Sequence, residues 1–283
     1  MNRSTLLAVA MVALTAAPIA AQQQYGREGS TWRWDGRVEN GRWMQIFNVN
    51  GSVQFSPSPD NMVLVVAEKR FDGRGRDDVH YEVVQEGGNV TICAIWNENS
   101  RCEDGGMESI RRNQNEQNHT TVRFTVQVPK GLRVGAHSVN GGVTVRDVGA
   151  EVTARTVNGA VEVRNASGRV RANTVNGTVD VNTAVGPVSA HTVNGDVEAR
   201  MTTLQGDDDM DFKTVNGSVT IVVPASFDAN FRFDTVHGGI DSDFPMTLTG
   251  RFGPRHARGT IGKGGGRDIT ASAVNGSIEL RKQ

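Results

Sequence analysis

Four aspartates in one short segment are the residues whose type and spacing best suit a metal ion. The candidate metal ligands are Asp207, Asp208, Asp209 and Asp211. Calcium prefers clustered carboxylate oxygens, so this segment is a candidate calcium site. Calcium-binding nonapeptide rolls carry Gly-Gly-x-Gly-x-Asp in each repeat, and this chain lacks that pattern. The missing pattern favours the alternative interpretation, which is a solvated acidic insertion without metal.

Sequence motifs for other site chemistry are absent. There is no His-Glu-x-x-His, no Gly-x-Ser-x-Gly and no Walker loop. The segment GKGGGR at 262–267 has the glycines and cations of a phosphate-binding loop. It does not lie between a strand and a helix, which favours a flexible turn. We therefore expect no catalytic residue, no cofactor and no enzymatic activity.

Cys93 and Cys102 are the only two cysteines. In an oxidising compartment such a pair forms a disulfide; the alternative is two free buried thiols. The polar stretch 97–118 is predicted to be a long loop. The disulfide would tether this loop to the strand that carries Cys93.

The first residues have the features of a secretory signal peptide. A short basic start with Arg3 precedes an apolar run at 6–17, and the small residues Ala20 and Ala21 come just before three glutamines. We predict cleavage after Ala21 and export to the periplasm, the cell surface or the medium. No later segment is apolar enough to span a bilayer. The formal net charge of −1 gives no electrostatic reason to bind nucleic acid.

Seven nonapeptides follow one another without a gap from Ser138. They read SVNGGVTVR, DVGAEVTAR, TVNGAVEVR, NASGRVRAN, TVNGTVDVN, TAVGPVSAH and TVNGDVEAR. A fixed period is the signature of a repeat architecture. Positions 2, 6 and 8 are always valine or alanine. We expect all three to point inward, so that each pair of nonapeptides supplies six small core side chains.

Asn-Gly occurs only in every second nonapeptide, so the true period is 18 residues. The usual context of Asn-Gly is an antiparallel hairpin, and an array of hairpins is the alternative fold. Identical residues at a fixed spacing favour stacked parallel coils instead, because each residue then lies about 4.8 Å above its equivalent. The expected fold class is all-β: a parallel, β-roll-like β-solenoid of 18-residue coils, preceded by an N-terminal β-strand region.

Stacked coils would place equivalent side chains in rows. A structural ladder of amides is predicted, with His237 replacing one asparagine. Its asparagines are Asn140, Asn158, Asn176, Asn194, Asn216 and Asn275. Acidic residues at 162, 180 and 198 would lie beside arginines at 146, 164 and 200. Exposed ion pairs are weak, which favours solubility and register as the role of these charged rows; a ligand platform is the alternative.

Aromatic residues flank the repeats and are absent between Leu132 and Asp211. Repeat arrays need capped ends, and we expect the caps in these aromatic flanks. The predicted organisation is a signal peptide at 1–21, an N-terminal β region with the long polar loop at 22–130, and a β-solenoid repeat domain at 131–283.

Several motifs resemble those of the bacterial putative-adhesin domain family. They are Asn-Val-Asn-Gly-Ser-Val at 48–53, the strand ending in Val128-Pro129, the series of Thr-Val-Asn-Gly turns, the strand-then-proline unit at 222–224 and the ending GTIGKGGGRDITASAVNGSIEL. The resemblance extends over residues 43–283. It implies an exported all-β solenoid and transfers no catalytic residue.

The predicted function is that of a non-enzymatic, adhesin-like or structural binding protein of the bacterial cell envelope. Its expected partner is a cell-surface or envelope protein or a glycan, and not a nucleic acid. One alternative is a polysaccharide-active β-helix enzyme, which requires convergent carboxylates and aromatic platforms; the stretch without aromatic residues argues against it. The other alternative is an envelope-stress or regulatory accessory protein.

Overall fold

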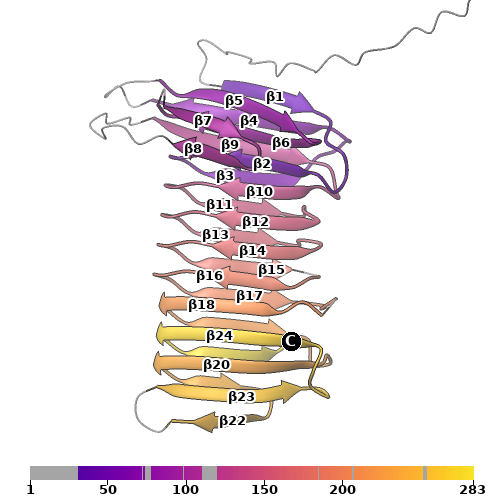
Figure 1. The fold of residues 1–283 in the computed structure, drawn as a ribbon, viewed down its shortest axis with the longest axis vertical. Coiled ribbons are helices and arrows are strands. Elements are labelled where there is room, and N and C mark those ends of the chain that lie inside the picture. The colour runs from indigo at the N-terminus through magenta and orange to yellow at the C-terminus, as the bar shows by residue number, and fades with distance from the viewer. Residues whose placement is uncertain are drawn as a thin grey trace, which may run out of the picture.

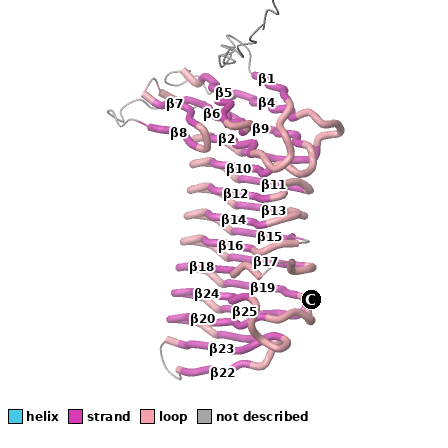
Figure 2. Tube along the Cα trace, turned by 45° about the vertical axis from the view of Figure 1, so that its right-hand side comes forward, coloured by secondary structure: helices cyan, strands magenta, loops and turns pink. Residues whose placement is uncertain are grey.

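Two long β-sheets face each other along the molecule (Figure 1). The computed structural model describes residues 31–71, 73, 78–97, 99–109, 120–183, 185–205, 207–250 and 254–283. The predicted signal peptide at 1–21 lies outside the described residues. Strands and loops make up all of the described chain in Figure 2.

The first sheet has 11 strands. In spatial order they are β1 (Thr31–Gly36), β4 (Val63–Arg70), β9 (Thr121–Val128), β3 (Val53–Pro57), β11 (Val143–Arg146), β13 (Val161–Arg164), β15 (Val179–Thr183), β17 (Val197–Met201), β19 (Val219–Val223), β25 (Ile278–Lys282) and β21 (Ile240–Ser242).

The second sheet has 12 strands. In spatial order they are β22 (Met246–Thr249), β23 (Arg255–Ile261), β20 (Ala229–His237), β24 (Arg267–Asn275), β18 (Met210–Asn216), β16 (Val188–His191), β14 (Arg169–Asn173), β12 (Glu151–Arg155), β10 (Arg133–His137), β2 (Trp43–Phe47), β6 (Asn89–Ile95) and β5 (His80–Glu86). A separate hairpin consists of β7 (Ser100–Glu103) and β8 (Gly106–Ser109).

Each coil of the central region contributes one strand to each sheet, and successive coils pair in parallel. Val143 pairs with Val161, and Val161 pairs with Val179, so the register is the 18-residue period of the sequence. The other sheet repeats this register, with Val152 opposite Val170. The predicted parallel β-solenoid is confirmed, and the hairpin array is wrong for these repeats.

The core between the sheets differs from the prediction at one position of the repeat. Val161, Val163, Ala166, Val170 and Ala172 are buried as expected. Position 2 of the Asn-Gly nonapeptides, however, points outward: Val157 is 37% exposed, whereas the preceding Thr156 is only 5% exposed. The alternation of a strand does not extend through this corner, because the chain bends there from one sheet to the other. Thr156, Thr174 and Thr192 are thus buried at the corner in place of the predicted valine, and Ser138 is buried at the corner of the first coil.

Antiparallel strands extend both sheets at one end of the solenoid and the second sheet at the other end. At one end β4 pairs with β9, β1 with β4, and β5 with β6. At the other end β23 pairs with β20 and β22 with β23. Aromatic rings pack at these ends: Trp32 stacks on Tyr81 at 4.9 Å, and Phe231 stacks on Phe233 at 4.9 Å. The flanks rich in aromatic residues therefore supply the bulk that fills these ends.

The stacking order of the coils departs from the order of the sequence in two places. The coil of β24 and β25 lies between that of β18 and β19 and that of β20 and β21. The coil of β2 and β3 is also out of sequence order: β2 lies between β6 and β10 in the second sheet, and β3 lies between β9 and β11 in the first. Both sheets thus run without a break across residues 130–131, through the ladders β2–β10 and β3–β11. The division into regions 22–130 and 131–283 remains an interpretation of the sequence.

Two substitutions at neighbouring positions test the inward and outward faces. Val179 is 1% exposed, and Thr178 is exposed. We expect Val179→Asp to reduce the free energy of unfolding by about 3 kcal/mol or more, because it buries an unpaired charge. Thr178→Asp should change it by less than about 1 kcal/mol. Urea denaturation followed by circular dichroism measures both, and equal stabilities would contradict the assigned faces.

Candidate functional site

The repeated Thr-Val-Asn-Gly corner gives the molecule its most regular surface, and its threonine points inward. The Oγ1 of Thr156 donates to the carbonyl oxygen of Gly141 at 2.7 Å, so a buried hydroxyl links neighbouring coils. Equivalent bonds of 2.9 Å join Thr174 to Gly159, Thr192 to Gly177, Thr214 to Gly195 and Thr235 to Gly276. A valine would not satisfy these buried carbonyl groups in the same way.

The glycine of the corner is required by the close approach of neighbouring backbones. A Cβ atom added at Gly177 would lie 2.1 Å from the carbonyl oxygen of Gly159 in the adjacent coil. That contact is far inside van der Waals distance, and the oxygen belongs to the backbone. Any residue with a side chain would therefore push the coils apart at the corner.

The asparagine side chains form a continuous ladder along the corner. Each side-chain nitrogen Nδ2 donates to the side-chain oxygen Oδ1 of the previous member of the stack. The donor–acceptor pairs are Asn140–Asn50 (2.6 Å), Asn158–Asn140 (2.8 Å), Asn176–Asn158 (2.8 Å), Asn194–Asn176 (2.7 Å), Asn216–Asn194 (2.8 Å) and Asn275–Asn216 (2.8 Å). His237 pairs with Asn275 through the strand register.

Asn50 is a member of this ladder that the sequence analysis missed. The signal was available, because Asn50 belongs to the Asn-Val-Asn-Gly motif at 48–51. It lies 90 positions before its partner Asn140, whereas the central repeats are 18 residues apart. A search limited to the uninterrupted period does not find it.

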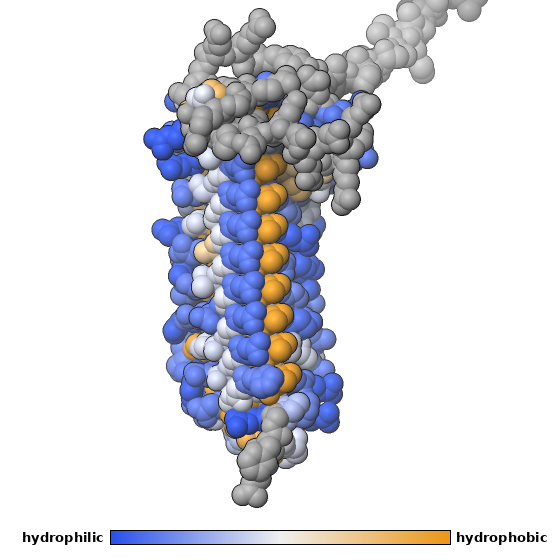
Figure 3. Space-filling model, turned by 90° about the vertical axis from the view of Figure 1, so that its left-hand side faces the viewer, coloured by the Kyte–Doolittle hydropathy of each residue, from blue (hydrophilic) through white to orange (hydrophobic). Residues whose placement is uncertain are grey.

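The valines of the corner form an exposed apolar stripe beside the asparagine ladder. Figure 3 shows the stripe as an orange column next to a blue one. Its members are between 37% and 40% exposed, and they are Val139, Val157, Val175, Val193, Val215, Val274 and Val236. We call this stripe together with the ladder the valine–asparagine edge. It is the candidate functional site, because aligned exposed apolar residues are a mark of interaction surfaces.

Charged rows lie on the outer face of the first sheet. Arg146 pairs with Glu162 at 3.0 Å, and Arg164 contacts both Glu162 and Asp180, so the pairs link successive coils. Arg200 pairs with Glu198 at 2.8 Å. Burial alone would raise the pKa of Glu162, but hydrogen bonds from Arg164 and Arg146 hold it below its usual value. These arginines neutralise a row of carboxylates that would otherwise repel one another.

Three of the four candidate metal ligands, Asp208, Asp209 and Asp211, contact different protein groups. Asp208 pairs with Arg169 at 2.6 Å, and Asp209 accepts the backbone N–H of Asp268 at 2.8 Å. No group of three or more metal-ligating side chains occurs among the residues that the structure describes.

Asp211 has partners of its own within the second sheet. Its carboxylate contacts Lys213 at 2.6 Å and His191 at 2.8 Å. Burial raises the pKa of Asp211, and hydrogen bonds from Lys213 and Thr270 outweigh that effect and lower it. The carboxylate is thus already compensated by protein groups.

Calcium should therefore have little effect on folding. We expect the protein to give the same strand-rich circular dichroism in chelator and in excess calcium, because Asp208, Asp209 and Asp211 already have protein partners. A cooperative gain of structure on adding calcium would contradict this expectation.

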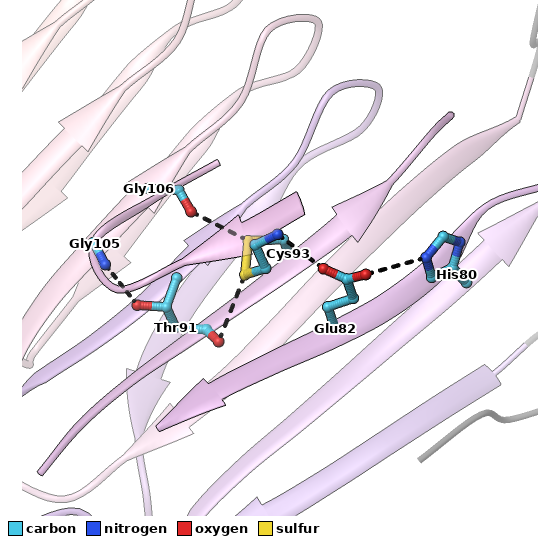
Figure 4. Close-up of a disulfide and its surroundings, with 7 residues drawn as sticks. His80, Glu82, Thr91, Cys93, Gly105 and Gly106 are labelled. Atoms are coloured by element: carbon cyan, nitrogen blue, oxygen red, sulfur yellow. Dashed lines mark hydrogen bonds and ion pairs between the residues drawn. A yellow bond between two sulfur atoms is a disulfide. The ribbon is translucent and has the colours of Figure 1, made fainter. Parts of the chain in front are cut away.

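The predicted disulfide between Cys93 and Cys102 is confirmed, with an S–S distance of 2.00 Å (Figure 4). It attaches the β7–β8 hairpin to β6. The Glu82 carboxylate accepts the N–H of Cys102 at 2.8 Å, and Thr91 Oγ1 accepts the N–H of Gly105 at 3.0 Å. The stretch 97–118 was expected to be a loop; residues 100–109 instead contain this hairpin, and residues 98 and 110–118 lie outside the described residues.

His137 lies two residues before Val139 of the stripe and is partly buried against an aromatic ring. Its imidazole stacks on Phe47 with ring centroids 4.3 Å apart. Burial and the nearby positive charge of Arg155 lower the pKa of His137 from 6.5 to about 4. The folded protein thus holds this imidazole neutral.

The neutral state of His137 makes stability depend on pH. Below pH 6.5 the unfolded chain takes up a proton that the folded chain does not bind until about pH 4. The free energy of unfolding should therefore fall by about 2–3 kcal/mol between pH 7 and pH 4 from this group. We expect His137→Gln to flatten that slope in urea denaturation. An unchanged slope would show that His137 is not its source.

An open groove of about 510 Å³ lies at the other corner of the coils. Its lining includes Lys130, Asp147 and Asn165, and Asn165 donates to the Asp147 carboxylate at 2.7 Å. One cation and one engaged carboxylate do not provide the paired carboxylates of glycoside cleavage. The groove therefore offers no support for the enzyme alternative.

Comparison with known proteins identifies one family. The model of the family described as Toastrack DUF4097 matches residues 133–281, which is more than half of the 283 residues. No curated protein matches the chain. Among the residues that the structure describes, none forms a helix long and apolar enough to cross a membrane.

Three solved structures match over most of their length at low identity. A putative cell adhesion protein from Clostridium sporogenes is 11% identical, with a TM-score of 0.33, and covers 89% of this chain and 100% of its own. A putative adhesin from Bacteroides fragilis is 10% identical, with a TM-score of 0.37, and the match covers 89% of this chain and 98% of the adhesin. A putative lipid binding protein from Parabacteroides distasonis is 11% identical, with a TM-score of 0.38, and the match covers 89% of this chain and 97% of that protein. Scores at this level add nothing to the evidence for function.

Proposed function

We propose that this chain, which belongs to the Toastrack DUF4097 family, is an exported, non-enzymatic protein of the bacterial cell envelope that binds another macromolecule along its valine–asparagine edge. The proposed partner is a cell-surface or envelope protein or a glycan. Export follows from the predicted signal peptide, and the Cys93–Cys102 disulfide is consistent with an oxidising compartment.

The exposed valine stripe is the observation that carries this proposal. A single exposed valine on a protein surface needs no explanation. Seven valines with nearly equal exposure lie in one row, each next to an asparagine or histidine of the same corner. The apolar row can exclude water from a partner, while the adjacent amides keep the surface polar enough to remain hydrated when free.

The rigidity of the edge supports a binding role. The corners at 156–159, 174–177, 192–195 and 214–217 are each held by a buried threonine hydrogen bond, a close glycine contact and an amide bond to the neighbouring coil. A partner therefore meets side chains that are already fixed in position, and little conformational entropy is lost on binding.

A pair of double variants with equal charge change tests the edge. Val157→Lys with Val193→Lys places two cations on the stripe, two coils apart. Thr153→Lys with Ser189→Lys places two cations on the outer face of the second sheet at the same 36-residue separation. We expect the edge variant to lose at least about tenfold in affinity for envelope fractions, which corresponds to about 1.4 kcal/mol, while the control binds like the wild type.

Thermal unfolding checks that both variants remain folded. Equal binding by the two variants would contradict the proposed edge. Release of reducing sugars from envelope polysaccharide by the wild type would instead support the enzyme alternative.

A further inference from the structure

Asn-Gly is the dipeptide most prone to deamidation, and this chain contains eight copies. They are Asn40, Asn50, Asn140, Asn158, Asn176, Asn194, Asn216 and Asn275, each followed by glycine. In this reaction the glycine nitrogen loses its proton to hydroxide and forms a bond to the asparagine Cγ. Nδ2 takes up a proton from water, the Cγ–Nδ2 bond breaks and ammonia leaves, which returns hydroxide. A second water molecule then opens the cyclic imide to aspartate or isoaspartate. The reaction needs only water and base, so it threatens any long-lived exported protein.

The attacking nitrogen is occupied at every Asn-Gly of the ladder. The N–H of Gly177 donates to the carbonyl oxygen of Asn194 in the next coil at 2.9 Å. Equivalent bonds run from Gly51 to Asn140 (2.7 Å), Gly141 to Asn158 (2.9 Å), Gly159 to Asn176 (2.9 Å), Gly195 to Asn216 (2.9 Å), Gly217 to Asn275 (3.0 Å) and Gly276 to His237 (3.0 Å). Base cannot remove these protons until the two coils separate locally.

The reacting carbon is held in place as well. The side-chain amide of Asn176 donates to Asn158 and accepts from Asn194, with distances of 2.8 Å and 2.7 Å. Both bonds must break before Cγ can turn toward the nitrogen of Gly177. The same stacking that forms the ladder therefore resists cyclisation at two atoms of each site.

The last corner of the stack lacks both restraints, the hydrogen-bonded glycine N–H and the asparagine amide held from both sides. His237–Gly238 stacks on Asn275–Gly276, and among the described residues no further Thr-Val-Asn-Gly corner stacks beyond it. Among the residues that the structure describes, no carbonyl oxygen accepts the N–H of Gly238, in contrast to the seven glycines above. The chain carries histidine at this position, and histidine cannot deamidate.

We propose that the stacked corner protects its own Asn-Gly sequences from deamidation, and that position 237 is the ladder position at which an asparagine would be modified. Deamidation inside the ladder would place a carboxylate oxygen against the Oδ1 of the preceding asparagine, where two acceptors would face each other. Protection of these sites therefore preserves the register of the edge. Asn40 lies outside the ladder, in the turn before β2, and is not part of this comparison.

The variant His237→Asn tests the proposal within a single molecule. Asparagine occupies the equivalent position in all the remaining corners of the ladder, so we expect the variant to keep the backbone and the stacking. During incubation of the full mature protein at mildly alkaline pH, we expect position 237 to deamidate at least about tenfold faster than Asn158 or Asn176, a factor equal to about 1.4 kcal/mol. Peptide mass mapping, with aspartate and isoaspartate separated by chromatography, gives the rate at each site.

Two further measurements complete the test. His237→Gln carries an amide that cyclises far more slowly, so it should stay unmodified while folding like His237→Asn. In denaturant, position 237, Asn158 and Asn176 should deamidate at similar rates, because the stack is gone. The proposal is overturned if position 237 in the folded variant reacts as slowly as Asn176, or if Asn176 reacts as fast in the folded protein as in the denatured one.

Discussion

Parallel pairing of each coil with an equivalent coil is the constraint on which the rest of the structure depends. The ladders join Val143 to Val161 and Val161 to Val179, so every residue of a central coil lies against its own equivalent. A single coil buries too little apolar surface to offset the entropy of ordering its backbone. Only side chains that tolerate a copy of themselves about 4.8 Å away can occupy such a row.

Each row of the repeat satisfies this requirement by its own chemistry. Asparagine both donates and accepts, so Asn158, Asn176 and Asn194 form a chain of amide bonds. Valine stacks through its methyl groups, and threonine directs its hydroxyl to a glycine carbonyl. Carboxylates do not tolerate one another, and here arginines such as Arg164 separate Glu162 from Asp180. The repeated motif is thus the set of residues that can be stacked on themselves.

The repeat and its period made the fold class and the parallel register predictable, because both depend on spacing along the chain. The disulfide was predictable for another reason, since Cys93 and Cys102 are the only two cysteines. The outward direction of Val157 was not predictable from alternation, since a corner interrupts the strand pattern that alternation assumes. The hairpin at residues 100–109 has no apolar pattern of its own and depends on the Cys93–Cys102 bond and Glu82. The position of Asn50 next to Asn140 depends on long-range stacking that local spacing does not contain.

The insertion of the last coil into the stack determines how the solenoid resists unravelling. In a simple solenoid the chain terminus is also the end of the stack, and it can fray one coil at a time. Here β25 lies between β19 and β21, and the N–H of Gln283 donates to the carbonyl of Val223 at 2.9 Å. Releasing the C-terminal strand therefore requires breaking ladders on both of its sides. At the end of the stack the antiparallel β23 and β22 extend the second sheet beyond β20, whereas β21 is the last strand of the first sheet, so the edge of that sheet is β21 and not β25.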